Sequence, residues 1–328
     1  MVGASAGGVE ALKELVAALP MDFRASVLVV LHLPPTGMSA LPAILDRAGP
    51  LPARHVVDGD SLRPGQILVA PPDRHLLVVD DHVRLTRGPR ENGHRPAVDV
   101  LFRSAAKALG ARTAAVVLSG SLDDGAAGAL AVSMRGGVCL VQDFDEALHD
   151  GMPRATASAV GLEGMPVKEI ANRLAEVAVA DPSTGQPAAP HVVAVEAAMA
   201  DLDPAAMHDP ERPGRPSGFA CPDCHGVLFE IDDHGLSRFR CRVGHAWSAE
   251  SLVARQTIEL EGALWMALRS LEEKAALNKD LARRARERGN DLTAVRFDEA
   301  ATEATHAAER VRIMVVDMGG PGEGGARP

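Results

Sequence analysis

The sequence predicts an α/β protein in which a doubly wound, mostly parallel sheet precedes a small cysteine-rich module and a C-terminal helical hairpin. Short apolar runs alternate with helical patterns over the first 180 residues, which predicts the sheet. Three of the four cysteines lie within Cys221–Cys241, which predicts the module. Beyond residue 248, apolar residues recur every three or four positions, which predicts the hairpin. A chain of 328 residues is long enough for more than one domain.

The strands of the predicted sheet are continuous apolar runs rich in β-branched residues, as expected for strands covered by helices on both faces. These runs span residues 26–32, 113–119 and 137–142. Helices are expected at 8–19, 39–48, 97–109 and 125–135. Only Met1, Val2 and Gly3 precede the first helical turn, so the first strand is expected to be very short.

Residues 66–70 and 75–86 alternate apolar and polar side chains more evenly than the other runs. Pro71, Pro72 and Asp73 join the two stretches and favour a turn. Because alternation is typical of half-buried strands, we expect these stretches to form an antiparallel hairpin at one edge of the sheet.

Shifts in composition predict where the domains end. The α/β domain gives way to a linker rich in Pro, Ala, Gly and Asp, with one short ordered piece. The cysteine-rich module follows, then a helical hairpin broken at Gly289-Asn290, and then a disordered Gly/Pro tail. The predicted segments are 1–182, 183–216, 217–248, 249–317 and 318–328.

The charge and hydropathy of the chain exclude several classes of function. A formal net charge of −10 argues against nucleic-acid binding, which requires neutralising phosphates. The sequence contains no run of 18 apolar residues and no N-terminal signal-peptide pattern. We therefore expect a soluble, cytoplasmic protein without membrane insertion.

The cysteine cluster has the spacing of a metal site. Cys221 and Cys224 form a C-x2-C knuckle, and Cys241 and His245 form a second knuckle after sixteen intervening residues. Such a pair of knuckles suits tetrahedral Zn²⁺, so we expect a structural zinc ribbon with these four ligands. His225 and His234 are alternative nitrogen ligands. Cys139 lies alone in an apolar run and is expected to be an ordinary buried residue.

A G-x-S-x-G string at residues 3–7 leads directly into the first predicted helix. A serine on such a turn can act as a nucleophile, which makes Ser5 a candidate. The glycines also permit a phosphate-binding loop at a helix N-terminus, or a plain tight turn.

Two further polar residues are expected on the same rim of the sheet as Ser5. His32 ends the second predicted strand, and Asp124 follows the strand at 113–119. Carboxyl ends of parallel strands meet at one edge, and a serine, a histidine and a carboxylate there are the set that nucleophilic catalysis requires. Alternatively, His32 is a hydrogen-bonded rim residue and Asp124 caps its helix.

Five motifs occur in order within residues 1–175: Gly3-Ala4-Ser5-Ala6-Gly7-Gly8, His32-Leu33-Pro34-Pro35, His94-Arg95-Pro96-Ala97-Val98-Asp99, Gly120-Ser121-Leu122-Asp123-Asp124-Gly125 and Gly151-Met152-Pro153. Together they resemble the CheB-type protein-glutamate methylesterase domain of bacterial chemotaxis. The resemblance implies that Ser5 is the nucleophile, His32 the general base and Asp124 its orienting carboxylate. It also implies hydrolysis of glutamate methyl esters on methyl-accepting receptors, deamidation of glutamine, and no cofactor for catalysis.

The chain departs from the family pattern in two places. The loop before Asp124 reads Gly-Ser-Leu-Asp-Asp-Gly where the family usually has Gly-Met-Gly-Asn-Asp-Gly, so a backbone amide at Ser121 is the expected oxyanion donor. Ala6, the second residue expected in the oxyanion loops, stands beside the nucleophile where threonine is common.

No receiver domain precedes residue 1, so we expect a standalone form of the family. Its C-terminal extension is expected to bind a partner or to self-associate. The alternative to an enzyme is a signalling adaptor that binds receptor-like helices through the same fold with little or no turnover.

Overall fold

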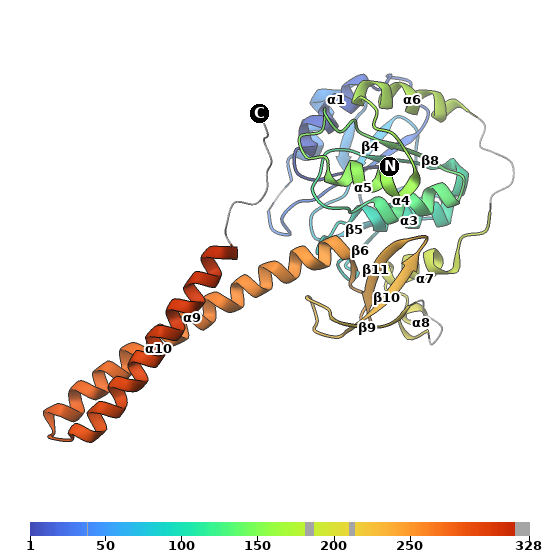
Figure 1. Cartoon of the computed structure of the whole chain (residues 1–328). Helices are drawn as coiled ribbons and strands as arrows, with labels where there is room; N and C mark the ends of the chain where they lie inside the picture. The colour runs from blue at the N-terminus through green and yellow to red at the C-terminus, as the bar shows by residue number, and fades with distance from the viewer. Residues whose placement is uncertain (38, 181–186, 210–213, 319–328) are drawn as a thin grey trace. The chain divides into compact units, whose positions relative to one another are not determined.

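The computed structural model describes residues 1–37, 39–180, 187–209 and 214–318 (Figure 1). Its largest sheet has six strands in the order β3-β4-β2-β1-β7-β8, and every neighbouring pair is parallel. The strands are β1 (Val2–Ala4), β2 (Ser26–Leu31), β3 (Ala53–His55), β4 (Gln66–Val69), β7 (Ala114–Val117) and β8 (Val138–Val141). The order runs outward in both directions from β1, which confirms the predicted doubly wound sheet.

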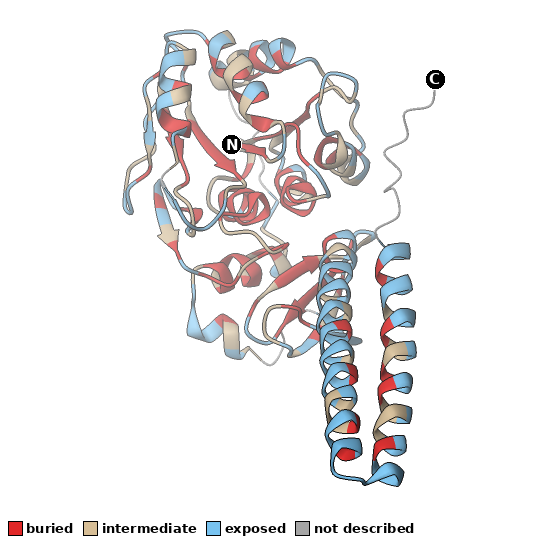
Figure 2. Ribbon diagram, turned by 90° about the vertical axis from the view of Figure 1, so that its left-hand side faces the viewer, coloured by how far each residue is buried: buried red, intermediate tan, exposed pale blue. Residues whose placement is uncertain are grey.

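Helices cover both faces of this sheet. Helices α1 (Gly8–Ala18), α2 (Leu41–Ala48) and α6 (Val167–Val179) share one apolar core with it. Helices α3 (Val98–Leu109), α4 (Ala126–Met134) and α5 (Gly151–Val160) share the other, and a short 3-10 turn at Gly110–Arg112 follows α3. Because both faces are covered, strands β1, β2, β4, β7 and β8 are buried along most of their length, as the red arrows in Figure 2 show, whereas the edge strand β3 has no buried residue.

The antiparallel hairpin is formed by different strands from the ones predicted. β4 is a parallel strand between β2 and β3, and the hairpin is formed instead within residues 75–86 by β5 (His75–Val79) and β6 (His82–Thr86). Asp80 and Asp81 make its two-residue turn, and Asp80 has the positive φ of 52° that such turns require. Residues 66–70 therefore do not pair with 75–86, because the chain reverses at Asp80 and not at the prolines.

Two helices lie in the segment predicted as a linker. They are α7 (His191–Ala200) and α8 (Pro204–His208). Val193 of α7 joins the apolar core that contains α3, and Ala200 packs against Val100 of α3. The rest of the predicted linker includes residues 181–186 and 210–213, which lie outside the described residues.

The cysteine-rich module is a four-stranded antiparallel sheet in the order β12-β11-β10-β9. Its strands are β9 (Arg215–Ala220), β10 (Val227–Asp233), β11 (Leu236–Cys241) and β12 (Ala246–Ser248). Residues Met1–Leu252 form one compact unit that includes this sheet. How this unit divides into an esterase domain, a linker and a ribbon stays a prediction.

The second unit, Val253–Pro328, contains most of α9 (Ala249–Glu287) and all of α10 (Asp291–Met318). The predicted break at Gly289-Asn290 is confirmed: Gly289 has a φ of 73°, and Asn290 N donates to the carbonyl oxygen of Ala285. Small buried side chains form the contact face of the hairpin, among them Ala275, Ala282, Ala294 and Ala301. Beyond Met318, the predicted tail lies outside the described residues. None of the helices described is long and apolar enough to cross a lipid bilayer.

Buried His75 joins the β5–β6 hairpin to the start of α3. Its Nε2 donates to the carbonyl oxygen of Pro89 at 2.9 Å, and its Nδ1 accepts from Ala97 N at 3.3 Å. A proton on Nδ1 would oppose the Ala97 N–H, so only the neutral ring satisfies both contacts. Burial lowers the pKa of His75 to about 4.

This histidine predicts a loss of stability in acid. Because the ring binds a proton more weakly in the folded chain than in the unfolded one, its stabilisation is complete above about pH 6.5 and is lost toward pH 4. We expect the free energy of unfolding to fall by about 3 kcal/mol more in wild type than in His75→Gln across that range, measured by urea denaturation. Replacing the exposed His82 by Gln is the control. Parallel curves for wild type and His75→Gln would contradict the assignment.

Candidate functional site

The predicted site residues lie at the carboxyl ends of three adjacent strands, in the order β2-β1-β7. Ser5 follows β1 directly, His32 follows β2 directly, and Asp124 lies beyond β7 in the turn that begins α4. The strand order reverses here, and in doubly wound sheets the loops diverge at such a point and leave a crevice.

The structure brings His32 and Asp124 into direct contact. His32 Nε2 lies 2.7 Å from Asp124 Oδ2, and both side chains are almost fully buried. The carboxylate also accepts backbone N–H groups from Val98 at 2.7 Å and Asp99 at 3.2 Å, and the Nδ2 of Asn92 at 3.3 Å. Asp124 therefore does not cap its own helix α4, since its oxygens accept hydrogen bonds from His32, from Asn92 and from the first residues of α3.

These donors determine the charge of Asp124. Burial alone would raise the pKa of its carboxyl group, but the hydrogen bond from His32 and the nearby imidazoles hold that pKa well below its ordinary value. Asp124 is therefore an anion at neutral pH and accepts the Nε2 proton of His32. The neutral ring then carries its lone pair on Nδ1.

Ser5 lies in the same pocket as His32. This open pocket is also lined by the His32-Leu33-Pro34-Pro35 stretch and by Arg90, Gly93, His94 and Arg95. His32 Nδ1 is buried, and it has no hydrogen-bond partner among the described residues. It is therefore not hydrogen-bonded to the Ser5 hydroxyl. Hydrogen bonds of this kind are often long without substrate, so the free Nδ1 is the atom that can accept the serine proton.

The turn that carries Ser5 is fixed by backbone hydrogen bonds. Ser5 N donates to the carbonyl oxygen of Ser119 at 2.9 Å, and Gly8 N donates to that of Ser5 at 3.0 Å. Gly7, between them, has a φ of 72°, a conformation that favours glycine. The amide of Ser5 itself is consequently not free to bind an oxyanion.

The two predicted oxyanion residues, Ala6 and Ser121, are both exposed and lie on neighbouring loops. The Ser119 hydroxyl joins these loops by donating to the carbonyl oxygen of Ala6 at 2.8 Å. Gly120 lies directly against the nucleophile, since a Cβ atom built on it would be 3.0 Å from Ser5 Cβ and 2.1 Å from Met152 Sδ. Amides of these loops are therefore close to Ser5.

A second histidine stacks on His32. The rings of His32 and His94 lie 3.6 Å apart with an interplanar angle of 10°. Burial lowers the pKa of His94 to about 4. His94 is therefore neutral near pH 7 and fixes the plane of the His32 ring. Sequence reasoning noted His94 and Gly120 only within motifs and missed Asn92, because ring stacking and close approach have no local pattern.

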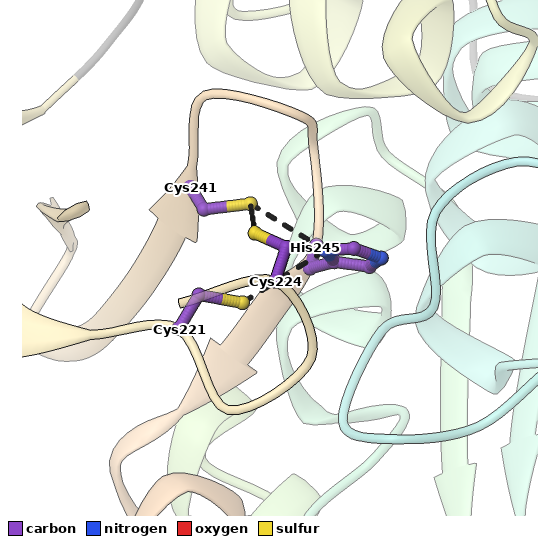
Figure 3. Close-up of side chains that lie close together, drawn as sticks. All are labelled: Cys221, Cys224, Cys241 and His245. Atoms are coloured by element: carbon purple, nitrogen blue, oxygen red, sulfur yellow. Dashed lines mark hydrogen bonds between the residues drawn. The ribbon is translucent and has the colours of Figure 1, made fainter. Parts of the chain in front are cut away.

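The four predicted metal ligands also come together (Figure 3). Cys221, Cys224, Cys241 and His245 place their ligand atoms within 4.8 Å of one another. The Cys224–Cys241 sulfur pair is 3.6 Å apart, and His245 Nδ1 lies 3.6 and 3.8 Å from the sulfurs of Cys241 and Cys221. Zinc–sulfur bonds of about 2.3 Å and zinc–nitrogen bonds of about 2.0 Å in a tetrahedron require edges of this length. The chemistry and spacing of the donors therefore fit zinc.

Residues 1–174 match the profile of a family described as CheB methylesterase. The chain is 40% identical over 182 residues to a protein-glutamate methylesterase/protein-glutamine glutaminase of Pseudomonas aeruginosa, covering 54% of this chain and 52% of that protein. A relative of the same name from a Nocardioides species is 44% identical over 163 residues, covering 48% of this chain and 44% of that protein. The chain thus spans about half the length of the curated relatives it matches.

A solved structure is similar as well. The CheB methylesterase catalytic domain of Thermotoga maritima aligns with a TM-score of 0.51 and 31% sequence identity. The alignment covers 54% of this chain and 96% of that domain. The likeness therefore lies in the α/β part and supports the fold assigned above.

The close packing at Gly120 leads to a stability prediction. A methyl group there would collide with Met152 and press on Ser5, so we expect Gly120→Ala to lower the free energy of unfolding by about 1–3 kcal/mol in urea denaturation. Gly262→Ala is the matched control, because open space surrounds Gly262 inside α9 and alanine should stabilise that helix by about 1 kcal/mol. Wild-type stability in Gly120→Ala would show that the Gly120 loop does not pack against Met152 and Ser5.

Proposed function

The chain belongs to the CheB methylesterase family, and we propose that it hydrolyses glutamate methyl esters on methyl-accepting receptor proteins through a Ser5-His32-Asp124 triad. The 2.7 Å contact between His32 and Asp124, beside Ser5 at the carboxyl edge of the sheet, is the observation that carries this proposal. The names of the relatives support both the esterase activity and the deamidation of glutamine.

The reaction proceeds through an acyl-enzyme. Ser5 Oγ attacks the ester carbonyl carbon while its proton moves to His32 Nδ1, and the ionised Asp124 stabilises the imidazolium that forms. His32 then passes the proton to the departing methoxide, which leaves as methanol. A water molecule, deprotonated by the same nitrogen, releases the glutamate carboxylate and restores Ser5. With glutamine as substrate, ammonia leaves in place of methanol.

The tetrahedral intermediate requires donors for its oxyanion. The amides of Ala6 and Ser121 are proposed for this role, since their loops border Ser5 and the amide of Ser5 is already engaged. No cofactor takes part in these steps.

The pocket rim suits an acidic protein surface. Arg90 and Arg95 both line the pocket, and Arg95 is held in place by Asp73 at 2.6 Å. Positive charge at the mouth attracts a receptor segment rich in glutamates, some of them unmethylated. The substrate class is therefore a methylated, acidic helix of a receptor.

Methanol release from a methylated receptor tests the proposal. We expect Ser5→Ala to lower kcat by about 10⁴-fold or more, and Asp124→Asn by a similar factor because it disturbs the tautomer of His32. Ser158→Ala, on the exposed surface of α5, is the control and should keep wild-type activity. Equal methanol release by wild type and Ser5→Ala would reject the triad.

The adaptor alternative differs in the reactivity of the serine. A fluorophosphonate probe should label an activated Ser5 far faster than it labels Ser158. If both serines label at the same slow rate, the fold binds receptor helices without turnover.

We propose in addition that Cys221, Cys224, Cys241 and His245 hold one structural zinc ion. Four protein ligands leave no open position, so the ion would stabilise the ribbon and take no part in the chemistry. The helical hairpin is proposed to bind a partner or a second copy, since apolar side chains such as Trp265 and Ile313 are exposed on it.

Elemental analysis tests the zinc assignment. We expect one zinc per chain in wild type and in Cys139→Ser, because Cys139 lies in β8 and is not part of the cluster. Cys221→Ser should lose most of its zinc, since structural sites bind through the full ligand set. Zinc retained by Cys221→Ser at the wild-type level would refute this ligand set.

A further inference from the structure

Strand β12 of the ribbon adds to the loop that borders the catalytic pair. Ala246 N donates to the carbonyl oxygen of Arg90 at 3.2 Å, and Asn92 N donates to that of Ala246 at 2.8 Å. The contact has parallel strand geometry, with Glu91 opposite Ala246. The same loop carries His94, which stacks on His32. Backbone pairing with the ribbon therefore fixes the loop that holds the imidazole plane.

The side chain of Asn92 carries this connection to Asp124. Its Oδ1 accepts from Ser248 N at 2.8 Å, and its Nδ2 lies 3.3 Å from Asp124 Oδ1. Because Ser248 N is a donor, the amide oxygen must face β12 and the amide nitrogen must face the carboxylate. One amide group therefore bridges the ribbon and the carboxylate that orients His32.

The turn before Asp124 is held from the same side. The hydroxyls of Ser248 and Ser251 donate to Asp123 Oδ1 at 2.7 and 3.1 Å. Beyond the turn, Asp99 Oδ1 accepts from Gly125 N at 3.0 Å and from Gly128 N at 2.6 Å. Asp124 is thus fixed between a ribbon contact on one side and the start of α4 on the other.

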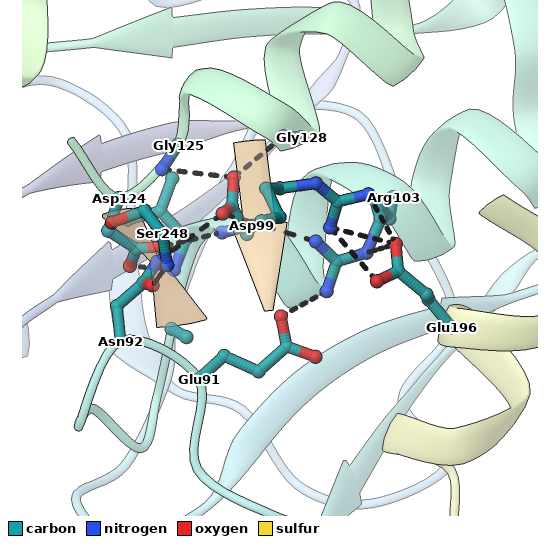
Figure 4. A network of polar contacts seen from close by, with 12 residues as sticks. Glu91, Asn92, Asp99, Arg103, Asp124, Gly125, Gly128, Glu196 and Ser248 are labelled. Carbon is teal, nitrogen blue, oxygen red and sulfur yellow. Dashed lines mark hydrogen bonds and ion pairs between the residues drawn. The ribbon is translucent and has the colours of Figure 1, made fainter. Parts of the chain in front are cut away.

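A buried ionic network attaches the ribbon to the α/β part. Arg240 of β11 donates to Glu91 at 2.9 Å, and Arg238 and Arg240 both contact Glu196 of α7. Arg103 of α3 contacts Glu91 and Glu196 as well (Figure 4). All five side chains are nearly inaccessible to solvent, so each charge is stabilised by its partners in place of water. The ribbon therefore has one preferred position on the α/β part.

The predicted metal site lies next to the ribbon residues that make these contacts. Cys241 ends β11, and His245 immediately precedes β12, so two of the four ligands flank the turn that joins these strands. Metal binding at these ligands would fix the path of the chain from Arg240 to Ser248.

We propose that the metal-held ribbon is a positioning element for the catalytic pair, acting through β12, Asn92 and Ser248 on Asp124 and on the loop of His94. This inference rests on the proposed triad and zinc site. Asn92 and Ser248 are positioning residues, because they touch Asp124 or its turn and do not line the pocket that holds Ser5.

Removal of the metal from the whole chain tests the coupling with two measurements. Amide hydrogen exchange reports on residues 90–95, and the rate of fluorophosphonate labelling reports on Ser5. In the stripped protein we expect exchange at Asn92 to be at least about tenfold faster, and labelling to be about tenfold slower, since misplaced catalytic groups lose rate steeply. Unchanged exchange, or faster exchange with unchanged labelling, would overturn the proposal.

Variants in the metal-loaded chain decide the matter if stripping unfolds the ribbon. Asn92→Asp keeps the oxygen that accepts Ser248 N but removes the donor to Asp124, and Ser248→Ala removes the hydroxyl bound to Asp123. We expect each to lower kcat on a glutamate methyl ester peptide by about tenfold with KM unchanged. Ser217→Ala is the control, because that hydroxyl donates to the carbonyl oxygen of Leu228 inside the ribbon.

The outcomes separate this inference from the proposed function. Wild-type kcat in both Asn92→Asp and Ser248→Ala, or the same loss in Ser217→Ala, would overturn the positioning role. If wild type itself releases no methanol and Ser5 labels no faster than Ser158, the proposed function fails. Hydrogen exchange at residues 90–95 then still decides whether the ribbon holds the loop.

Discussion

The arrangement of the site depends on one buried charge, the carboxylate of Asp124. A carboxylate removed from water is stable only where protein donors replace its hydration. Here the donors come from the end of β2, from the loop at Asn92 and from the first residues of α3. Because each donor has a fixed direction, these segments cannot move independently. The same set of contacts that stabilises the anion therefore orients His32, and stability and chemistry share their geometry.

Much of the fold follows from local patterns in the sequence. Continuous apolar runs predicted β2, β7 and β8. The Gly289-Asn290 pair predicted the end of α9, where Gly289 adopts the left-handed conformation. The pairing of β4 was predicted wrongly, since the prolines after it resemble a hairpin turn while the true reversal is at Asp80. Strand pairing between distant segments is decided by burial on both faces, which no short window of sequence contains.

The candidate site also contains residues that the sequence predicted and residues that it did not. The spacing of Cys221, Cys224, Cys241 and His245 predicted a cluster that the fold brings together, because metal geometry restricts the sequence directly. The rim positions of His32 and Asp124 were predicted because each residue follows a strand of the predicted parallel sheet. The stacking of His94 on His32 and the bridge from Asn92 to Ser248 could not be predicted, since both join residues that are far apart in the chain.

The buried network around Glu196 joins residues inside the family match to residues beyond it. The family match ends at residue 174, whereas the compact unit extends to Leu252. Arg103 and Val100, inside the matched part, are covered by Glu196 and Ala200 outside it. A polypeptide cut at the family boundary would expose an apolar and charged face of α3. The matched part and the segment that follows it therefore share one buried surface, and a cut between them would open that surface to water.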